Sequence, residues 1–148
     1  MTATTQNNSQ TVAIGNLPQA ILVGGILALL GNIVILYVGR AFGIPFEVIP
    51  PGSAGLEQLT IVPLIFASFL PAIAAGVLLG ALQRYTPQPF TRFWQISLII
   101  LVLSFWGPTE ANTDSAATIT GLNMMHVMAG VAIIAAFSAL GREESPVA

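Results

Sequence analysis

The sequence has no cysteine and no lysine, and only four arginines and six acidic residues carry charge among its 148 residues. Without cysteine the chain can form no disulfide, bind no metal through a thiolate and use no thiol nucleophile. A soluble domain carries roughly a quarter charged residues, so this chain has too little charge to cover a water-exposed surface. The net charge of −2 and the lack of basic clusters also argue against a nucleic-acid partner.

Apolar residues take the place of charge and make up 55% of the chain. Four apolar runs approach or exceed the roughly 20 residues that a helix needs to cross a bilayer. We therefore predict an all-α protein, a transmembrane four-helix up-down bundle. The predicted spans are 20–39, 59–82, 91–107 and 116–140, and they form one bundle, 20–140, between a disordered cytoplasmic tail, 1–19, and a second cytoplasmic tail, 141–148.

The arginines predict the orientation of these spans. With four spans, Arg84, Arg92 and Arg142 share one side of the membrane with both termini, and Arg40 lies on the other side. The positive-inside rule then places both termini in the cytoplasm. The first run does not read as a signal peptide, because no positive charge precedes it and no small-residue cleavage site closes it.

Proline and apolar loop residues predict two local features. Pro63 and Pro71 each remove a backbone donor from the second run, so we expect that helix to be kinked. The first loop, "AFGIPFEVIPPGSAG" at 41–55, is too apolar for a free linker. We expect it to be ordered and to pack on the mouth of the bundle. Its expected polar contact is an ion pair of Arg40 with one of Glu47, Glu57, Glu110 or Asp114.

Small residues recur at three- or four-residue spacing in three of the runs. Such spacing lets helix backbones approach closely, which is how helices associate in lipid. We predict that these faces pack the helices of one subunit together, with dimerisation as the less favoured alternative. The small-residue faces are Gly24, Ala28 and Asn32; Ala72, Gly76 and Gly80; and Ala129, Ala132 and Ala136.

A few polar side chains lie inside the predicted spans at a similar depth. Counting about 1.5 Å per residue places Asn32, Ser68 and His126, the only histidine, roughly 10–15 Å into the bilayer from the outer side. Asn123 lies three residues before His126 and is expected on the same helix face. We predict that His126 faces the bundle interior and hydrogen-bonds to another span, with Asn32 as the partner. The candidate ligand-binding residues are His126, Asn32, Asn123 and Ser68.

These polar residues have two interpretations. They form either a satisfied polar core that sets helix register or a site marked by an intramembrane ionisable group. We assign no catalytic residue, because no G-x-S-x-G motif surrounds Ser68 or Ser104. We also expect no metal and no cofactor. A metal needs more ligands than His126 alone, and a histidine–methionine haem would need its two ligands on opposite sides of the iron.

Two short motifs carry a family resemblance. "LGNIVILYVGRAFG" and "TGLNMMHVMAG" resemble a family of uncharacterised bacterial four-span membrane proteins over nearly the whole chain. The residues that match its pattern are Asn32, Arg40, Met125 and His126. The resemblance implies a multi-pass protein of the bacterial inner (plasma) membrane, and it implies no substrate and no activity.

Two functions therefore stay open at this point. The first is a non-enzymatic bundle that binds a lipidic or small-molecule ligand or serves as an accessory subunit. The second is a small proton-linked transporter or intramembrane enzyme centred on His126. The expected partners are the lipid bilayer, such a ligand, and a membrane protein partner or further copies of the chain.

Overall fold

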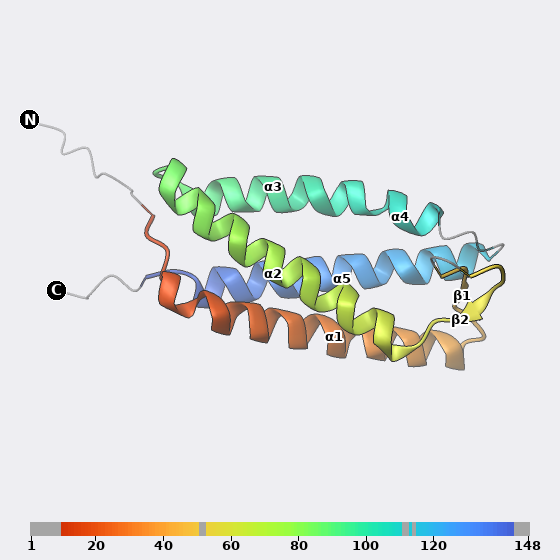
Figure 1. The fold of residues 1–148 in the computed structure, drawn as a ribbon. Helices are drawn as coiled ribbons and strands as arrows, with labels where there is room; N and C mark the ends of the chain where they lie inside the picture. Colours follow the sequence, from red (N-terminus) through yellow and green to blue (C-terminus); the bar gives the residue numbers. More distant parts are fainter. Residues whose placement is uncertain (1–9, 51–52, 111–112, 114, 144–148) are drawn as a thin grey trace, which may run out of the picture.

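Long helices make up most of the described structure (Figure 1). The computed structural model describes residues 10–50, 53–110, 113 and 115–143. Successive long helices run in opposite directions, so both ends of the described chain lie at one end of the bundle, here called the termini end. A short β-hairpin lies at the opposite, hairpin end. The helices are α1 (Leu17–Ala41), α2 (Ile61–Tyr85), α3 (Pro89–Ser104) with the short α4 (Trp106–Thr109), and α5 (Ala116–Leu140).

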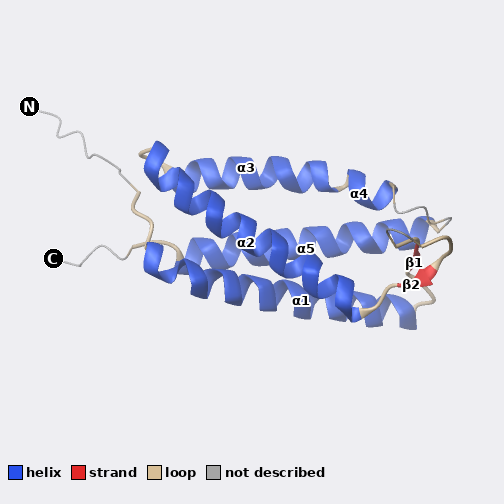
Figure 2. Cartoon of the chain, viewed as in Figure 1, coloured by secondary structure: helices blue, strands red, loops and turns tan. Residues whose placement is uncertain are grey.

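The predicted all-α, four-helix architecture is confirmed, and Figure 2 shows how little of the chain is strand. Four stretches are long and apolar enough to cross a membrane, with α3 and α4 counted as one. α5 begins at Ala116 as predicted, because the Ser115 side chain accepts a hydrogen bond of 3.2 Å from the Thr118 amide. This is a helix N-cap, which satisfies one of the amides that have no partner inside the helix.

The third span differs from its prediction in one respect: it is interrupted. α3 ends at Ser104, and the four-residue α4 follows after Phe105. Pro108 provides the physical reason. A proline has no amide hydrogen, so the carbonyl of Ser104, four residues earlier, has no helical donor at that position.

The centre of the bundle is the contact between α1 and α5. Gly24 approaches α5 so closely that a Cβ added there would lie 3.3 Å from the Cβ of Ala136. Ala28 is fully buried and clusters with Ala129 and Ala132. The small-residue faces predicted on the first and fourth runs therefore pack against each other. Towards the termini end the core becomes aromatic, with the rings of Phe93 and Phe137 5.7 Å apart.

Residues 10–19 correct the prediction of a disordered tail. The segment before α1 is hydrogen-bonded to the C-terminal end of the chain: Ala13 N donates to Gly141 O at 2.9 Å, and Glu143 N donates to Thr11 O at 3.2 Å. The Gln10 side chain accepts hydrogen bonds from the first amides of α3. A 3-10 turn, Ile14–Asn16, then leads into α1. Residues 1–9 and 144–148 of the predicted tails lie outside the described residues.

The described part of the first loop, which leaves out residues 51–52, is ordered as predicted. It contains an antiparallel hairpin of β1 (Glu47–Val48) and β2 (Glu57–Gln58). Phe46, which precedes β1, is fully buried, with its ring against Gly39 of α1 and Gly121 of α5. Its φ of 48° lies in the left-handed region, which is uncommon for a residue with a side chain. Burial of this ring holds the loop on the mouth of the bundle.

Arg40 makes none of the predicted ion pairs whose partner is a described residue. Its Nη2 donates to the carbonyl oxygen of Leu59 at 2.8 Å. Among the described residues its partner is thus a backbone carbonyl next to α2, rather than the carboxylate of Glu47, Glu57 or Glu110. The fourth predicted partner, Asp114, lies outside the described residues. The carbonyl lies within reach because the packed loop brings Leu59 back over the end of α1.

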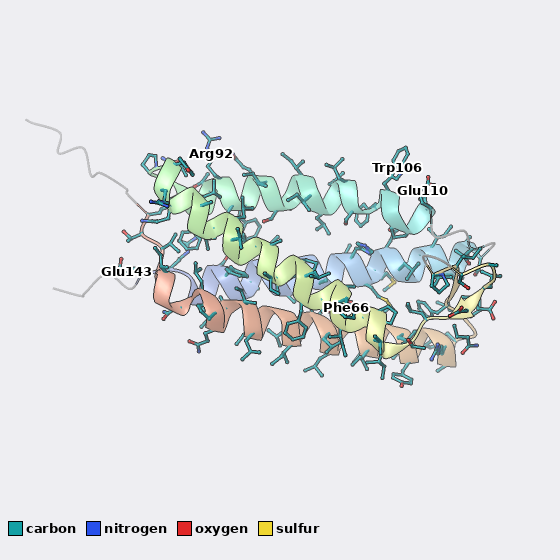
Figure 3. The ribbon with its side chains drawn as sticks, viewed as in Figure 1. Phe66, Arg92, Trp106, Glu110 and Glu143 are labelled. Carbon is teal, nitrogen blue, oxygen red and sulfur yellow. The ribbon has the colours of Figure 1, made fainter. Side chains whose placement is uncertain are left out.

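Charged side chains lie at the two ends of the bundle. Figure 3 shows Arg92 and Glu143 at the termini end and Glu110 at the hairpin end. Trp106, near Glu110, points away from the bundle and is mostly exposed. An apolar middle with charge and an amphipathic aromatic ring at the ends is the pattern expected of helices that cross a bilayer.

Candidate functional site

A cavity of about 550 Å³ lies between α2, α3 and α5, with Asn32 of α1 also in its wall. This volume falls within the roughly 300–1,000 Å³ of small-molecule sites in proteins. Most of its wall is apolar. Among the described residues that line it, the polar side chains are Asn32, Ser97, Ser104 and His126, and none is an aspartate, glutamate or arginine.

The α2 wall of the cavity is built from small and cyclic side chains. Pro63, Ala67, Pro71 and Ala74 follow one another at intervals of three or four residues, so they lie along one face of the helix. All four are exposed although they line the cavity. The cavity therefore opens to the outside along this edge of α2, on the side where α3 faces it.

The two prolines of α2 have different consequences. Pro63 lies in the first turn, where an amide has no partner within the helix in any case. Pro71 lies inside the helix, which continues through it to Tyr85. Because Pro71 has no amide hydrogen, the carbonyl of Ala67 lacks its usual helical donor. Ala67 and Pro71 both line the cavity, so this carbonyl belongs to the cavity-lining part of α2. Of the two prolines, only Pro71 therefore removes a hydrogen bond from within α2 and can cause the predicted kink.

His126 lines the cavity, in agreement with the prediction that it faces the bundle interior. Its hydrogen bond, however, is made within its own helix. Its Nδ1 lies 2.8 Å from the carbonyl oxygen of Leu122, one turn earlier in α5. A carbonyl only accepts, so Nδ1 donates, and in the neutral form of the ring Nε2 carries the lone pair. The predicted hydrogen bond between His126 and Asn32 is wrong, although both side chains line the same cavity.

Asn32 and Ser68 instead bond to each other and connect α1 to α2. The Asn32 Nδ2 donates to the Ser68 Oγ at 3.3 Å. Asn32 is only 3% exposed, and its Oδ1 is buried and meets no hydrogen-bond donor within the described part of the chain. Ser68 is fully buried and is not among the residues that line the cavity. Of this pair, Asn32 thus belongs to the cavity wall and Ser68 positions it.

Asn123 is not part of the cavity wall. Because Asn123 lies three residues before His126, it was predicted to lie on the same face of the helix. At its level of α5 the cavity is lined by Leu122, which lies about 100° around the helix from Asn123. The carbonyl oxygen of the Asn123 side chain is buried and has no partner among the described residues.

The α3 wall contains two serines that were not among the candidates. Ser104 donates to the Leu101 carbonyl at 2.6 Å, so its hydrogen is already engaged. Ser97 lies two turns earlier on the same helix and also lines the cavity. The signal that the sequence offered for this cavity was the row Pro63, Ala67 and Pro71, whose four-residue spacing puts proline on one face of an apolar helix.

Comparison with known proteins adds a family and no further relative. No curated protein and no solved structure matched the chain. The model of a family of unknown function, DUF6069, matches residues 12–143, which span the described bundle from the N-terminal segment to the end of the last helix. A match over that length shows that the chain belongs to the DUF6069 family of unknown function.

Proposed function

We propose that this protein is a non-enzymatic, four-span protein of the bacterial inner membrane, with both termini in the cytoplasm, that takes a lipid-like molecule from the bilayer into the cavity between α2, α3 and α5. The observation that carries the proposal is the cavity itself. It is large enough for a small ligand, its wall is mostly apolar, and exposed lining residues on α2 open it sideways.

The position of the opening supports a ligand that arrives from lipid. Pro63, Ala67, Pro71 and Ala74 lie along a helix that is apolar enough to cross a membrane. Ile100 of α3, on the opposite lip, is also exposed. A molecule that enters between these helices passes from hydrocarbon to an apolar wall, so its chain crosses no aqueous layer.

The cavity-blocking variant Ala74→Trp tests the proposal. The probe is a diazirine-bearing hexadecane in lipid nanodiscs, cross-linked by light and located by peptide mass spectrometry. In the wild type we expect labelling of α3 and α5 cavity residues that excess unlabelled hexadecane suppresses. Because an indole at position 74 occupies the cavity, the variant loses this saturable labelling and keeps the unsaturable labelling of its outer surface.

Val77→Trp is the matched control for this experiment. Val77 is on the same helix, is exposed and is not among the cavity-lining residues. It is expected to leave the saturable labelling intact. Labelling that is unsaturable in the wild type, or that both tryptophan variants reduce equally, would contradict binding in this cavity.

The orientation is tested by cysteine labelling, for which the chain has no background because it contains no cysteine. Ala54 in the first loop and Gln88 between α2 and α3 are exposed, at opposite ends of the bundle. An impermeant maleimide is expected to label Ala54→Cys on intact cells and Gln88→Cys only after permeabilisation, because Arg84, Arg92 and Arg142 favour the cytoplasmic side. The reverse pattern overturns the orientation, and labelling of both on intact cells overturns the four-span topology.

The alternative of a proton-linked transporter or enzyme centred on His126 has one observation in its favour. The imidazole lines the cavity, and no described residue forms a hydrogen bond with its Nε2. A proton path through a membrane usually includes a carboxylate as well, and the described residues of the cavity wall include none. Binding therefore remains the proposed function.

A further inference from the structure

We propose that the cavity selects a long-chain lipid with an uncharged, hydrogen-bond-donating head, a lipid alcohol, over lipids whose heads only accept hydrogen bonds or carry a charge. This inference rests on the proposed function, because it specifies which molecule the cavity takes from the bilayer. It is carried by the hydrogen-bonding character of the cavity wall, which offers several unengaged acceptors and few donors.

The first acceptor is the Nε2 of His126. Because a carbonyl has no hydrogen to give, Nδ1 donates to the Leu122 carbonyl, and in the neutral form of the ring Nε2 then carries the lone pair. No hydrogen bond engages Nε2 among the described residues. An imidazole held by a backbone bond at one nitrogen accepts at the other and is oriented to do so.

The second acceptor is the Oδ1 of Asn32. The Nδ2 of this amide is bonded to Ser68, while Oδ1 is buried and has no partner among the described residues. Asn32 lines the cavity and is almost fully buried. A buried carbonyl oxygen without a donor is unfavourable, so a hydroxyl that reaches Oδ1 from the cavity would give it the donor that it lacks.

The third acceptor is the backbone carbonyl of Ala67. Pro71 has no amide hydrogen to offer it, and both residues line the cavity. This acceptor belongs to α2, whereas His126 belongs to α5 and Asn32 to α1. The three acceptors in the cavity wall thus belong to three different helices.

Donors are scarce on the same wall. The Ser104 hydroxyl already donates to the Leu101 carbonyl. Ser97 both donates and accepts, so it does not discriminate between heads. A carboxylate or phosphate would find no arginine among the described residues that line the cavity, and burying an unpaired charge in apolar surroundings is strongly unfavourable. An ammonium would likewise lack a carboxylate there.

The experiment compares four probes with one chain length as competitors of the diazirine-bearing hexadecane in nanodiscs. They are 1-hexadecanol, its methyl ether, hexadecane and palmitate. The ether keeps the oxygen and lacks only the donor hydrogen. We expect hexadecanol to bind about fivefold more tightly than the ether, which corresponds to ~1 kcal/mol for one hydrogen bond, and palmitate to compete worst among the polar probes.

Variants then test which residues cause the preference for the alcohol over the ether. Asn32→Leu and His126→Phe are expected to bring the ratio of alcohol to ether close to one while hexadecane still binds. Two variants are used so that the test survives if one of them fails to fold. Asn123→Leu is the control: Asn123 is polar and lies on α5, but it is outside the cavity wall, so the ratio should be unchanged.

The outcomes separate this inference from the proposed function. Failure of hexadecane itself to compete would overturn binding in the cavity, and the inference with it. Equal binding of alcohol and ether, or tightest binding of palmitate, would overturn the selection of donors and leave the proposed function in place. A preference for the alcohol that survives in both Asn32→Leu and His126→Phe would also overturn the assignment.

Discussion

Phe46→Ala is expected to lower the free energy of unfolding by about 3–5 kcal/mol, the usual cost of removing a fully buried phenylalanine. The Phe46 ring has no exposed surface and fills the space beside two glycines. A Cβ added at Gly39 or Gly121 would lie 2.5 or 2.6 Å from that ring, so the glycines leave just the room that the ring takes. Without the ring the loop 42–60 loses its main anchor on α1 and α5.

Denaturant-induced unfolding in mild detergent, followed by circular dichroism, measures this loss. The matched control is Phe42→Ala, because Phe42 belongs to the same loop and is 85% exposed. Its effect should stay within about 0.5 kcal/mol, as for ordinary surface substitutions. Comparable losses in the two variants would show that the loop does not depend on the buried ring. Limited proteolysis should also cut the loop faster in the Phe46 variant alone.

Ala136→Leu is expected to destabilise the bundle by about 1–3 kcal/mol through overpacking. Ala136 is 5% exposed and faces Gly24 of α1. Since a Cβ at Gly24 would already lie 3.3 Å from the Ala136 Cβ, an isobutyl group at position 136 forces α1 away from α5. In a membrane this close approach supplies much of the packing energy, because lipid gives apolar helices no other reason to associate.

The neighbouring residue provides the control for that substitution. Ala135 lies next to Ala136 in α5 and is exposed. Ala135→Leu adds the same side chain to a surface that faces outwards, so unfolding in detergent should be nearly unchanged. If Ala135→Leu proved as destabilising as Ala136→Leu, the packing of α1 on α5 would not be the cause.

The spans were predictable because each contains an apolar run that approaches or exceeds the length needed to cross a bilayer. The start of the fourth span was predicted from its apolar run, whereas the Ser115 cap that explains this start was not predicted. The break after Ser104 was readable from Pro108, four residues further on, but it was not predicted. A proline near the end of an apolar run affects the carbonyl before it, and hydropathy does not report this effect.

The sequence was enough to place the polar residues of the candidate site at a similar depth, but it was not enough to predict their hydrogen-bond partners. The rise per residue placed Asn32 and His126 at similar levels, and both line one cavity. Which side chains meet depends on how each helix is rotated about its axis, and the sequence does not contain that angle. His126 found an acceptor on its own helix, at Leu122. A local carbonyl is always within reach of such a ring, whereas a partner on another helix requires a particular packing.

The loop was predictable as ordered, because its apolar content had to be buried. Its anchor was not predictable, because Phe46 adopts a left-handed backbone that its residue type rarely takes. The space that the Phe46 ring fills was not predictable either. Gly39 and Gly121 are 82 residues apart in the sequence, and only the packing of α1 against α5 makes them neighbours.

The pairing of the chain's two ends has a consequence for biogenesis. Val12 forms a β-bridge with Arg142, and Ala13 bonds to Gly141, across nearly the whole length of the chain. α1 also packs its small-residue face on α5, which follows the other three long helices in the sequence. In the proposed four-span topology, α1 therefore lacks its principal partner until α5 has been synthesised. Quality-control proteases that recognise unassembled helices should then rapidly clear a chain truncated before α5, in which the glycine and alanine face of α1 has no partner.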